Sequence, residues 1–194
     1  GVNKIILLSH LGFPADLDLA AKVDGIDIVV SGHTDTLMGD PAKIDPSLGK
    51  PTFPYPVVVN SPGGRTLIVH AFTWGRLVGR LNLVFSSDGK ITSWDGEPVF
   101  VDKNIPDDPA VAQKLAEMTK PLDDLKKQVI GKTLVNLDGR RAIVRNQESN
   151  LGNLVADATL WSTSRDNTQI AIVNGGGIRA SIPEGDISIA QVME

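Results

Sequence analysis

The chain has 194 residues, of which 41% are hydrophobic and 22% charged, as in an ordinary globular protein. Its 19 Lys and Arg against 23 Asp and Glu give a net charge of −4, which argues against a nucleic-acid-binding module, because such binding depends on clustered cations. No apolar run reaches the roughly 20 residues of a membrane span. The absence of cysteine excludes thiol catalysis, cysteine-ligated zinc and disulfides.

The N-terminal segment is predicted to form a βαβ unit. Residues 4–8 form a short apolar strand, residues 17–23 have a helical pattern with Asp16 as the N-cap, and residues 26–30 form a second strand. The strands of such a unit are parallel, so the loops that follow them lie at one edge of the sheet, where ligands bind. His10 and His33 each follow one of these strands, and we expect both at that edge.

The two strand-end histidines are candidate metal ligands. Imidazole is a common ligand, two such groups at one edge can share an ion, and Asp35 could add a carboxylate oxygen. Alternatively, both histidines cap their strands through hydrogen bonds, and the residues alone leave both interpretations open. His70 sits inside an alternating strand pattern, and we interpret it as structural.

The middle of the chain is predicted to contain a loop, antiparallel strands and a helix. Residues 39–56 are rich in Pro and Gly, and residues 57–101 alternate as antiparallel strands that close a sheet or sandwich, with a hairpin turn at SSDGK. Residues 110–130 have helical spacing and end at Gly131. Pro121 is expected to kink or split this helix, which we interpret as a linker with a hinge near its C-terminal end.

The C-terminal segment contains a candidate anion site. A strand and turn follow Gly131, an amphipathic helix is predicted from about residue 150 to 161, and residues 169–194 read as a strand, a glycine loop, a short strand and the start of a helix. In the sequence NGGGIR the glycines permit close approach of a ligand, and Arg179 offers a guanidinium fork suited to phosphate. Arg145 could add a second guanidinium. An ordinary tight loop between strands is the alternative interpretation.

Four blocks, LLSHLG, GIDIVVSGHTDT, ESNLGNLVADA and NGGGIRASIPEGDIS, resemble in this order the 5′-nucleotidase family of metallophosphoesterases, over essentially the whole chain. The resemblance implies an α/β (α+β) fold in three parts. Residues 1–104 would be the end of a metallophosphatase-type β-sandwich flanked by helices, residues 105–131 a linker helix, and residues 132–194 the first part of a mixed α/β substrate-binding C-terminal domain.

The resemblance also implies the roles of individual residues. His10 and His33 match metal-binding histidines of a dinuclear centre that takes two divalent ions, Zn, Mn, Mg or Co. Asp35 stands where relatives usually have His, Asn or Gln, and is expected to bind the second ion. The residues expected to contact the substrate are Arg145, Asn174, Gly176, Gly177 and Arg179.

The function implied is hydrolysis of nucleoside 5′-monophosphates to nucleoside and phosphate, by an extracellular, cell-surface or periplasmic enzyme. The alternatives are a 2′,3′-cyclic-nucleotide phosphodiesterase, a UDP-sugar hydrolase or a non-catalytic binding module. The family's D-x-H and GNH motifs, which supply the catalytic pair and most metal ligands, do not occur in the chain. We therefore expect the catalytic residues in an upstream part of a longer parent protein, and an inactive isolated chain.

Overall fold

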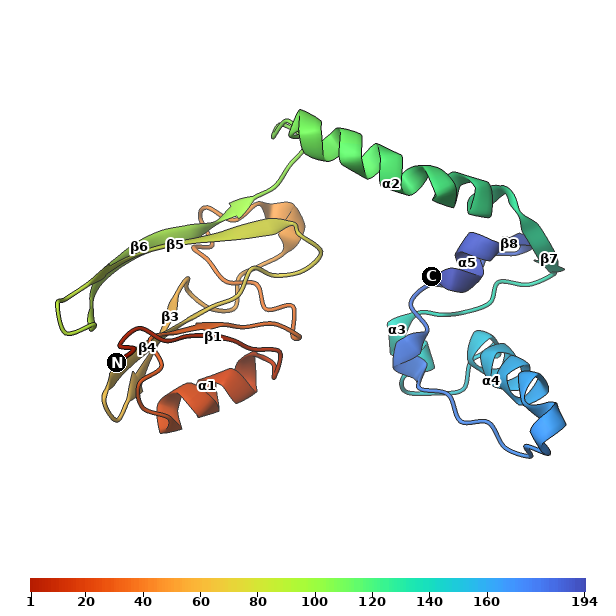
Figure 1. Ribbon diagram of the computed structural model, residues 1–194, viewed down its shortest axis with the longest axis horizontal. Helices are drawn as coiled ribbons and strands as arrows, with labels where there is room; N and C mark the ends of the chain where they lie inside the picture. The colour runs from red at the N-terminus through yellow and green to blue at the C-terminus, as the bar shows by residue number, and fades with distance from the viewer. The chain divides into compact units, whose positions relative to one another are not determined.

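A computed structural model describes residues 1–194, which divide into two compact units, Gly1–Pro106 and Asp107–Glu194. The mixed α/β content confirms the predicted fold class (Figure 1). None of the helices combines the length and the apolar character needed to cross a membrane. The first unit contains β1 Ile6–Leu8, α1 Phe13–Lys22, β2 Ile28–Val30, η1 Pro46–Leu48, β3 Val57–Ser61, β4 Gly64–Val69, β5 Leu77–Phe85 and β6 Ile91–Phe100. The second contains α2 Pro109–Lys127, β7 Val129–Thr133, α3 Arg141–Val144, α4 Asn150–Ser162, η2 Ser164–Asp166, η3 Gly175–Gly177, β8 Gly185–Ser188 and α5 Ile189–Met193.

The first unit is built on a four-stranded sheet with the strand order β1-β2-β4-β3. β1 and β2 are parallel, so the predicted βαβ unit is present, but β4 is also parallel to β2, and only β3 runs antiparallel to its neighbour. Within residues 57–101 the strands pair antiparallel as expected, β3 with β4 and β5 with β6, and the additional parallel contact of β4 with β2 was not predicted. Leu67 and Ile68 in β4 are both fully buried, as expected of an inner strand that is covered on both faces.

Two layers cover this sheet, α1 on one face and the antiparallel β5–β6 hairpin on the other (Figure 1). Alternate residues point to opposite faces of a strand, and the buried clusters follow that rule. Val29 and Ile68 pack with Phe13 of α1, whereas Ile28 and Leu67 pack on the side of the hairpin. The sheet is thereby fixed from both sides, which holds the loops at its ends in place.

Helix α1 begins earlier than its sequence pattern predicts. It starts at Phe13, and its N-cap is Gly12, which has a left-handed φ of 96°, so the assignment of the N-cap to Asp16 is wrong. Glycine reaches this φ without steric cost, and Pro14 suits the first turn because it needs no hydrogen-bonded amide there. Asp16 lies inside the helix instead and is fully buried.

Helix α2 does not break at its proline. It runs without interruption through Pro121 and has no buried residue, so water can reach the backbone carbonyl that the proline leaves without a partner. The helix ends at Lys127, and Gly131 lies within β7 rather than at the helix end. The function of this segment as a linker remains a prediction.

The second unit has a small core and two short strands. β7 pairs antiparallel with β8, and Leu137, Leu151 and Ile182 form the buried cluster. α4 lies close to its predicted position and begins at the cap of Ser149, whose hydroxyl accepts from the Gly152 amide. Residues 169–173 are not a strand as predicted, because no neighbouring strand pairs with them. Their isoleucines are among the most exposed apolar side chains of the chain.

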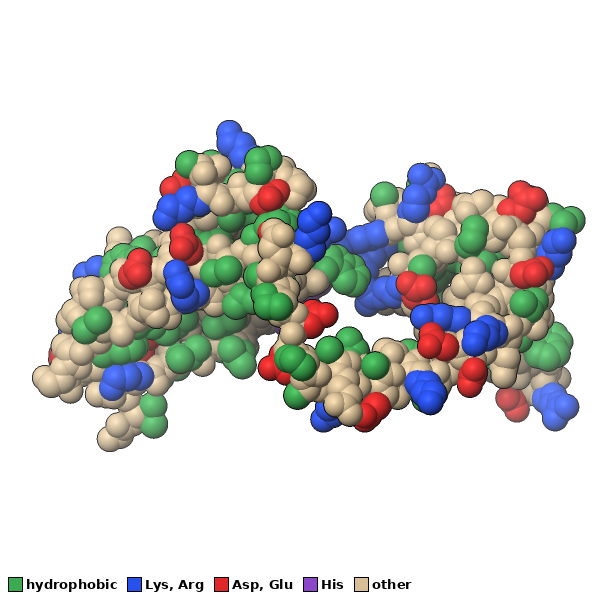
Figure 2. All heavy atoms as spheres, turned by 90° about the horizontal axis from the view of Figure 1, so that it is seen from above, with side chains coloured by type: hydrophobic (Ala, Val, Ile, Leu, Met, Phe, Trp, Pro, Cys, Tyr) green, Lys and Arg blue, Asp and Glu red, His purple; other side chains and the backbone are tan.

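Charged side chains are interspersed over the surface. Figure 2 shows acidic and basic groups side by side with hydrophobic ones, with no continuous field of one sign on that face. This distribution agrees with the small net charge of −4.

Candidate functional site

The loops beyond the carboxyl ends of β1 and β2 bring two histidines together. Nδ1 of His33 lies 3.3 Å from Nε2 of His10, and the two ring centroids are 5.0 Å apart with an interplanar angle of 69°. Both side chains are exposed to solvent. The two imidazole nitrogens thus lie within hydrogen-bonding distance of one another at the edge of the sheet.

The spacing of these nitrogens fits a shared divalent ion. Metal–nitrogen bonds of about 2.0–2.1 Å at the tetrahedral angle place two ligand nitrogens roughly 3.3–3.4 Å apart. A Cβ on Gly32 would lie 3.1 Å from Nδ1 of His10, so the absence of a side chain there leaves room for the imidazole. The ligand set is incomplete, because no group of three or more His, Cys, Asp or Glu in residues 1–194 is arranged to hold an ion. Asp35 is thus not assembled with the pair as a third ligand.

The backbone around this edge adopts conformations that non-glycine residues seldom take. φ is 72° at His33 and 51° at Asp35 in the loop after β2, and 62° at Phe72 and 59° at Trp74 in the segment after β4. Such left-handed positions cost roughly 1–3 kcal/mol each and concentrate at functional sites. Their clustering supports this edge as the candidate site.

His70 is also at the carboxyl edge, not inside a strand as its sequence pattern suggested. β4 ends at Val69, and His70 follows it directly, buried, with its Nδ1 accepting from the amide of Phe72 at 3.1 Å. Burial lowers the pKa of the His70 imidazole, while the backbone of Gly32 and the carboxylates of Asp35 and Asp16 oppose that shift. This shift favours the neutral imidazole, and the structural role expected from the sequence stays a prediction.

In the second unit the structure places Arg145 beside the glycine loop. Arg145 follows α3, and a Cβ on Gly176 would lie 3.3 Å from its Nη2. The side-chain oxygen of Asn174 accepts from the Gly176 amide at 3.0 Å, which caps η3. Gly175 approaches the preceding segment so closely that a Cβ there would lie 2.0 Å from the carbonyl oxygen of Val144. The glycines thus allow the contact between loop and arginine.

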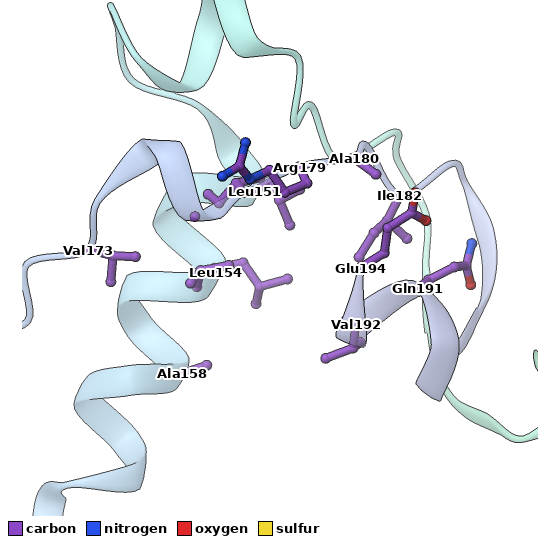
Figure 3. A pocket seen from close by; sticks show the side chains of 13 residues that line it. Leu151, Leu154, Ala158, Val173, Arg179, Ala180, Ile182, Gln191, Val192 and Glu194 are labelled. Atoms are coloured by element: carbon purple, nitrogen blue, oxygen red, sulfur yellow. The ribbon is translucent and has the colours of Figure 1, made fainter. Parts of the chain in front are cut away.

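Arg179 follows the same loop and lies at the edge of an apolar cavity of about 470 Å³. Figure 3 shows Leu154 of α4 and Val192 of α5 pointing toward one another across this cavity. Neither Arg145 nor Arg179 forms an ion pair within residues 1–194, in contrast to Arg140, which binds Asp138. Two exposed guanidinium groups without carboxylate partners are available for an external anion.

The close approach at Gly175 yields a stability prediction with a matched control. We expect Gly175→Ala to lower the free energy of unfolding of the second unit by about 1–3 kcal/mol, because the new methyl group meets the backbone of Val144. Gly177→Ala should change it by less than about 0.5 kcal/mol, since a Cβ there meets nothing within 4 Å. Urea unfolding of both variants measures the difference, and equal stabilities would contradict the close packing described here.

Comparison with known proteins covers both units. Residues 129–194 match the model of the "5'-nucleotidase, C-terminal domain" family. The chain is 41% identical to a snake venom 5′-nucleotidase of Macrovipera lebetinus over 95% of its own length and 38% identical to a human 5′-nucleotidase over 94%. A solved 5′-nucleotidase precursor from Thermus thermophilus matches 99% of the chain with 43% identity and a TM-score of 0.72. Residues 129–194 belong to the family of 5′-nucleotidase C-terminal domains, and the whole chain is similar to a stretch of 5′-nucleotidases.

The chain spans only part of the 5′-nucleotidases that it matches. It covers 47% of the Macrovipera lebetinus protein, 33% of the human protein and 38% of the Thermus thermophilus chain.

Sequence reasoning overlooked one residue near the histidine pair, the buried Asp16. Ser9 precedes the block HLG, and Ser31 precedes the block GH. These two serines were the sequence signal that could have indicated a shared hydrogen-bond acceptor such as Asp16.

Proposed function

We propose that the whole protein hydrolyses nucleoside 5′-monophosphates to nucleoside and phosphate with the help of divalent metal ions. The observation that carries this proposal is the 3.3 Å separation of the His10 and His33 ring nitrogens in a chain that is similar to a stretch of 5′-nucleotidases. The same separation allows a direct hydrogen bond between the two rings, and the resemblance of SHLG and SGH to metal-binding motifs of 5′-nucleotidases is what favours a shared ion. The spacing and this resemblance together support the proposal that the histidines bind metal rather than cap their strands.

The proposed roles follow from the chemistry of each group. His10 and His33 in their neutral forms hold one ion, and Asp35 contributes an oxygen to the second. When bound, divalent ions supply Lewis-acid stabilisation of the charge that develops on the phosphoryl oxygens. We place the catalytic residues outside these 194 residues.

The substrate's phosphate is proposed to bind in the second unit. Arg145 and Arg179 donate to its oxygens, and charge-assisted hydrogen bonds from a planar guanidinium fix both position and orientation. Asn174 contacts the substrate from the same loop, and the backbone at Gly176 and Gly177 leaves space for the ligand. Movement of one domain relative to the other, with α2 as the linker, would then bring substrate and metal ions together.

We also propose that the protein acts outside the cytoplasm. The support is that relatives at 38–41% identity include 5′-nucleotidases named for snake venom. Extracellular nucleotides would then be its substrates, and the remainder of the polypeptide its essential partner.

A phosphate-release assay on the whole protein tests the proposed function. After removal of metal by a chelator, we expect AMP hydrolysis to be lost and to return with Mn²⁺, Zn²⁺ or Co²⁺. AMP should be cleaved at least about tenfold faster than 2′,3′-cyclic AMP or UDP-glucose, a difference of about 1.4 kcal/mol in the barrier. As a control, the isolated 194-residue chain should release almost no phosphate. Faster cleavage of either competing substrate, or metal-independent turnover, would overturn the proposal.

A further inference from the structure

The first unit contains a buried carboxylate that the roles described above do not use. Asp16 of α1 is 0% exposed, and none of the ion pairs in residues 1–194 involves it. A buried carboxylate without a cationic partner is costly unless hydrogen bonds stabilise it. The stability of this buried carboxylate therefore depends on the groups that donate hydrogen bonds to its two oxygens.

Both donors come from the loops that carry the histidine pair. The Ser9 hydroxyl donates to Oδ1 of Asp16 at 2.5 Å, and the Ser31 hydroxyl donates to Oδ2. Ser9 directly precedes His10, and Ser31 stands two residues before His33. The Asp16 carboxylate thus links the two loops that carry His10 and His33.

The surrounding contacts make this link rigid. The Ser9 amide donates to the carbonyl of Val30 at 2.9 Å, and the Ser31 amide donates to the carbonyl of Val69 at 2.9 Å. The Ser9 hydroxyl also accepts from the Leu11 amide at 3.2 Å. Both serines are therefore held by backbone as well as side-chain hydrogen bonds, so Asp16 links two ordered segments rather than a loose loop.

We propose that Asp16 is a positioning residue that sets the separation of His10 and His33 for a divalent cation. The inference rests on the proposed metal function. Groups that orient metal ligands typically contribute a factor of about 10–100 to metal affinity. Asparagine has nearly the same shape as aspartate, but its side-chain oxygen can accept from one serine while its amide group faces the other. The serine that faces this amide must turn its hydroxyl to accept, and both contacts lose the charge of the carboxylate, so Asp16→Asn weakens the link without creating a cavity.

The test measures Zn²⁺ affinity by calorimetry on the whole protein, with Co²⁺ absorption as a spectroscopic report of coordination. We expect Asp16→Asn and the double variant Ser9→Ala/Ser31→Ala each to weaken Zn²⁺ binding at least about tenfold and to change the Co²⁺ spectrum. The variant that combines all three substitutions should weaken Zn²⁺ binding no more than whichever of Asp16→Asn and Ser9→Ala/Ser31→Ala has the larger effect, because both act on the same interaction. The matched control is Asp18→Asn, which alters an exposed carboxylate of the same helix and should leave affinity unchanged.

A second readout separates failure of this inference from failure of the proposed function. In metal-free protein labelled at histidine, nuclear Overhauser contacts between the His10 and His33 rings report their proximity, with assignments from His10→Gln and His33→Gln. Loss of these contacts in Asp16→Asn supports the positioning role even if the wild-type protein binds no Zn²⁺ at the pair. Unchanged contacts and unchanged Zn²⁺ affinity in folded Asp16→Asn would overturn it.

Discussion

Replacing either histidine of the pair is expected to abolish most AMP hydrolysis by the whole protein. His10→Ala and His33→Ala should each lower kcat at least about 100-fold, because loss of an ion removes several kcal/mol of transition-state stabilisation. Both side chains are exposed beyond strand ends, so their removal leaves the buried core unchanged. Kinetics at saturating metal, metal content and melting temperature measure the three effects.

His70→Gln provides the matched control for this experiment. The third histidine lies at the same edge of the sheet, but it is buried and hydrogen-bonded to the Phe72 amide. We expect its replacement to cost about 1–3 kcal/mol of stability while metal content is retained. Near-normal kcat in His10→Ala or His33→Ala would show that the histidine concerned is a strand cap and not a ligand.

The arginines of the second unit are expected to affect nucleotide binding without affecting metal content. Arg145→Ala and Arg179→Ala should each weaken AMP binding by about 1.5–3 kcal/mol, the usual contribution of a hydrogen bond to a charged group. Adenosine, which has no phosphate, should bind almost as well to the variants as to the wild type. Arg179→Lys should recover only part of the loss, because an ammonium group keeps the charge but not the planar fork.

Calorimetry with AMP and adenosine, paired with metal analysis, measures this selectivity. Arg165→Ala is the matched control, since it removes an exposed arginine from the same unit that is not assigned to the substrate site. Equal losses for AMP and adenosine in Arg179→Ala would mean that the loop shapes the pocket in general, and the phosphate assignment would then be wrong.

The sequence predicted the strands that position the site better than it predicted where they end and how the backbone turns after them. Short apolar runs ending in SH and SGH were enough to place two parallel strands and to bring His10 and His33 to one edge, since the geometry of a βαβ unit is nearly fixed. The end of β4 was missed because alternation continues through His70, whereas the backbone turns left-handed at Phe72. Left-handed conformations of non-glycine residues leave no reliable signature in a sequence.

Long-range side-chain contacts were the other feature that the sequence could not supply. Asp16 has the residue type and position of a helix cap, and only the fold shows that its carboxylate is buried between two loops. The contact of Arg145 with the glycine loop likewise depends on how α3 and η3 pack. Residues 169–173 have a strand-like composition, but a strand forms only where a neighbour completes its hydrogen bonds.

The most direct measurement is an anomalous difference map from crystals of the whole protein grown with Zn²⁺ or Mn²⁺. We expect a peak bonded to both Nε2 of His10 and Nδ1 of His33, at about 2.0–2.1 Å for zinc. A map from active protein that shows its metal ions elsewhere and no peak at this pair would contradict metal binding by His10 and His33.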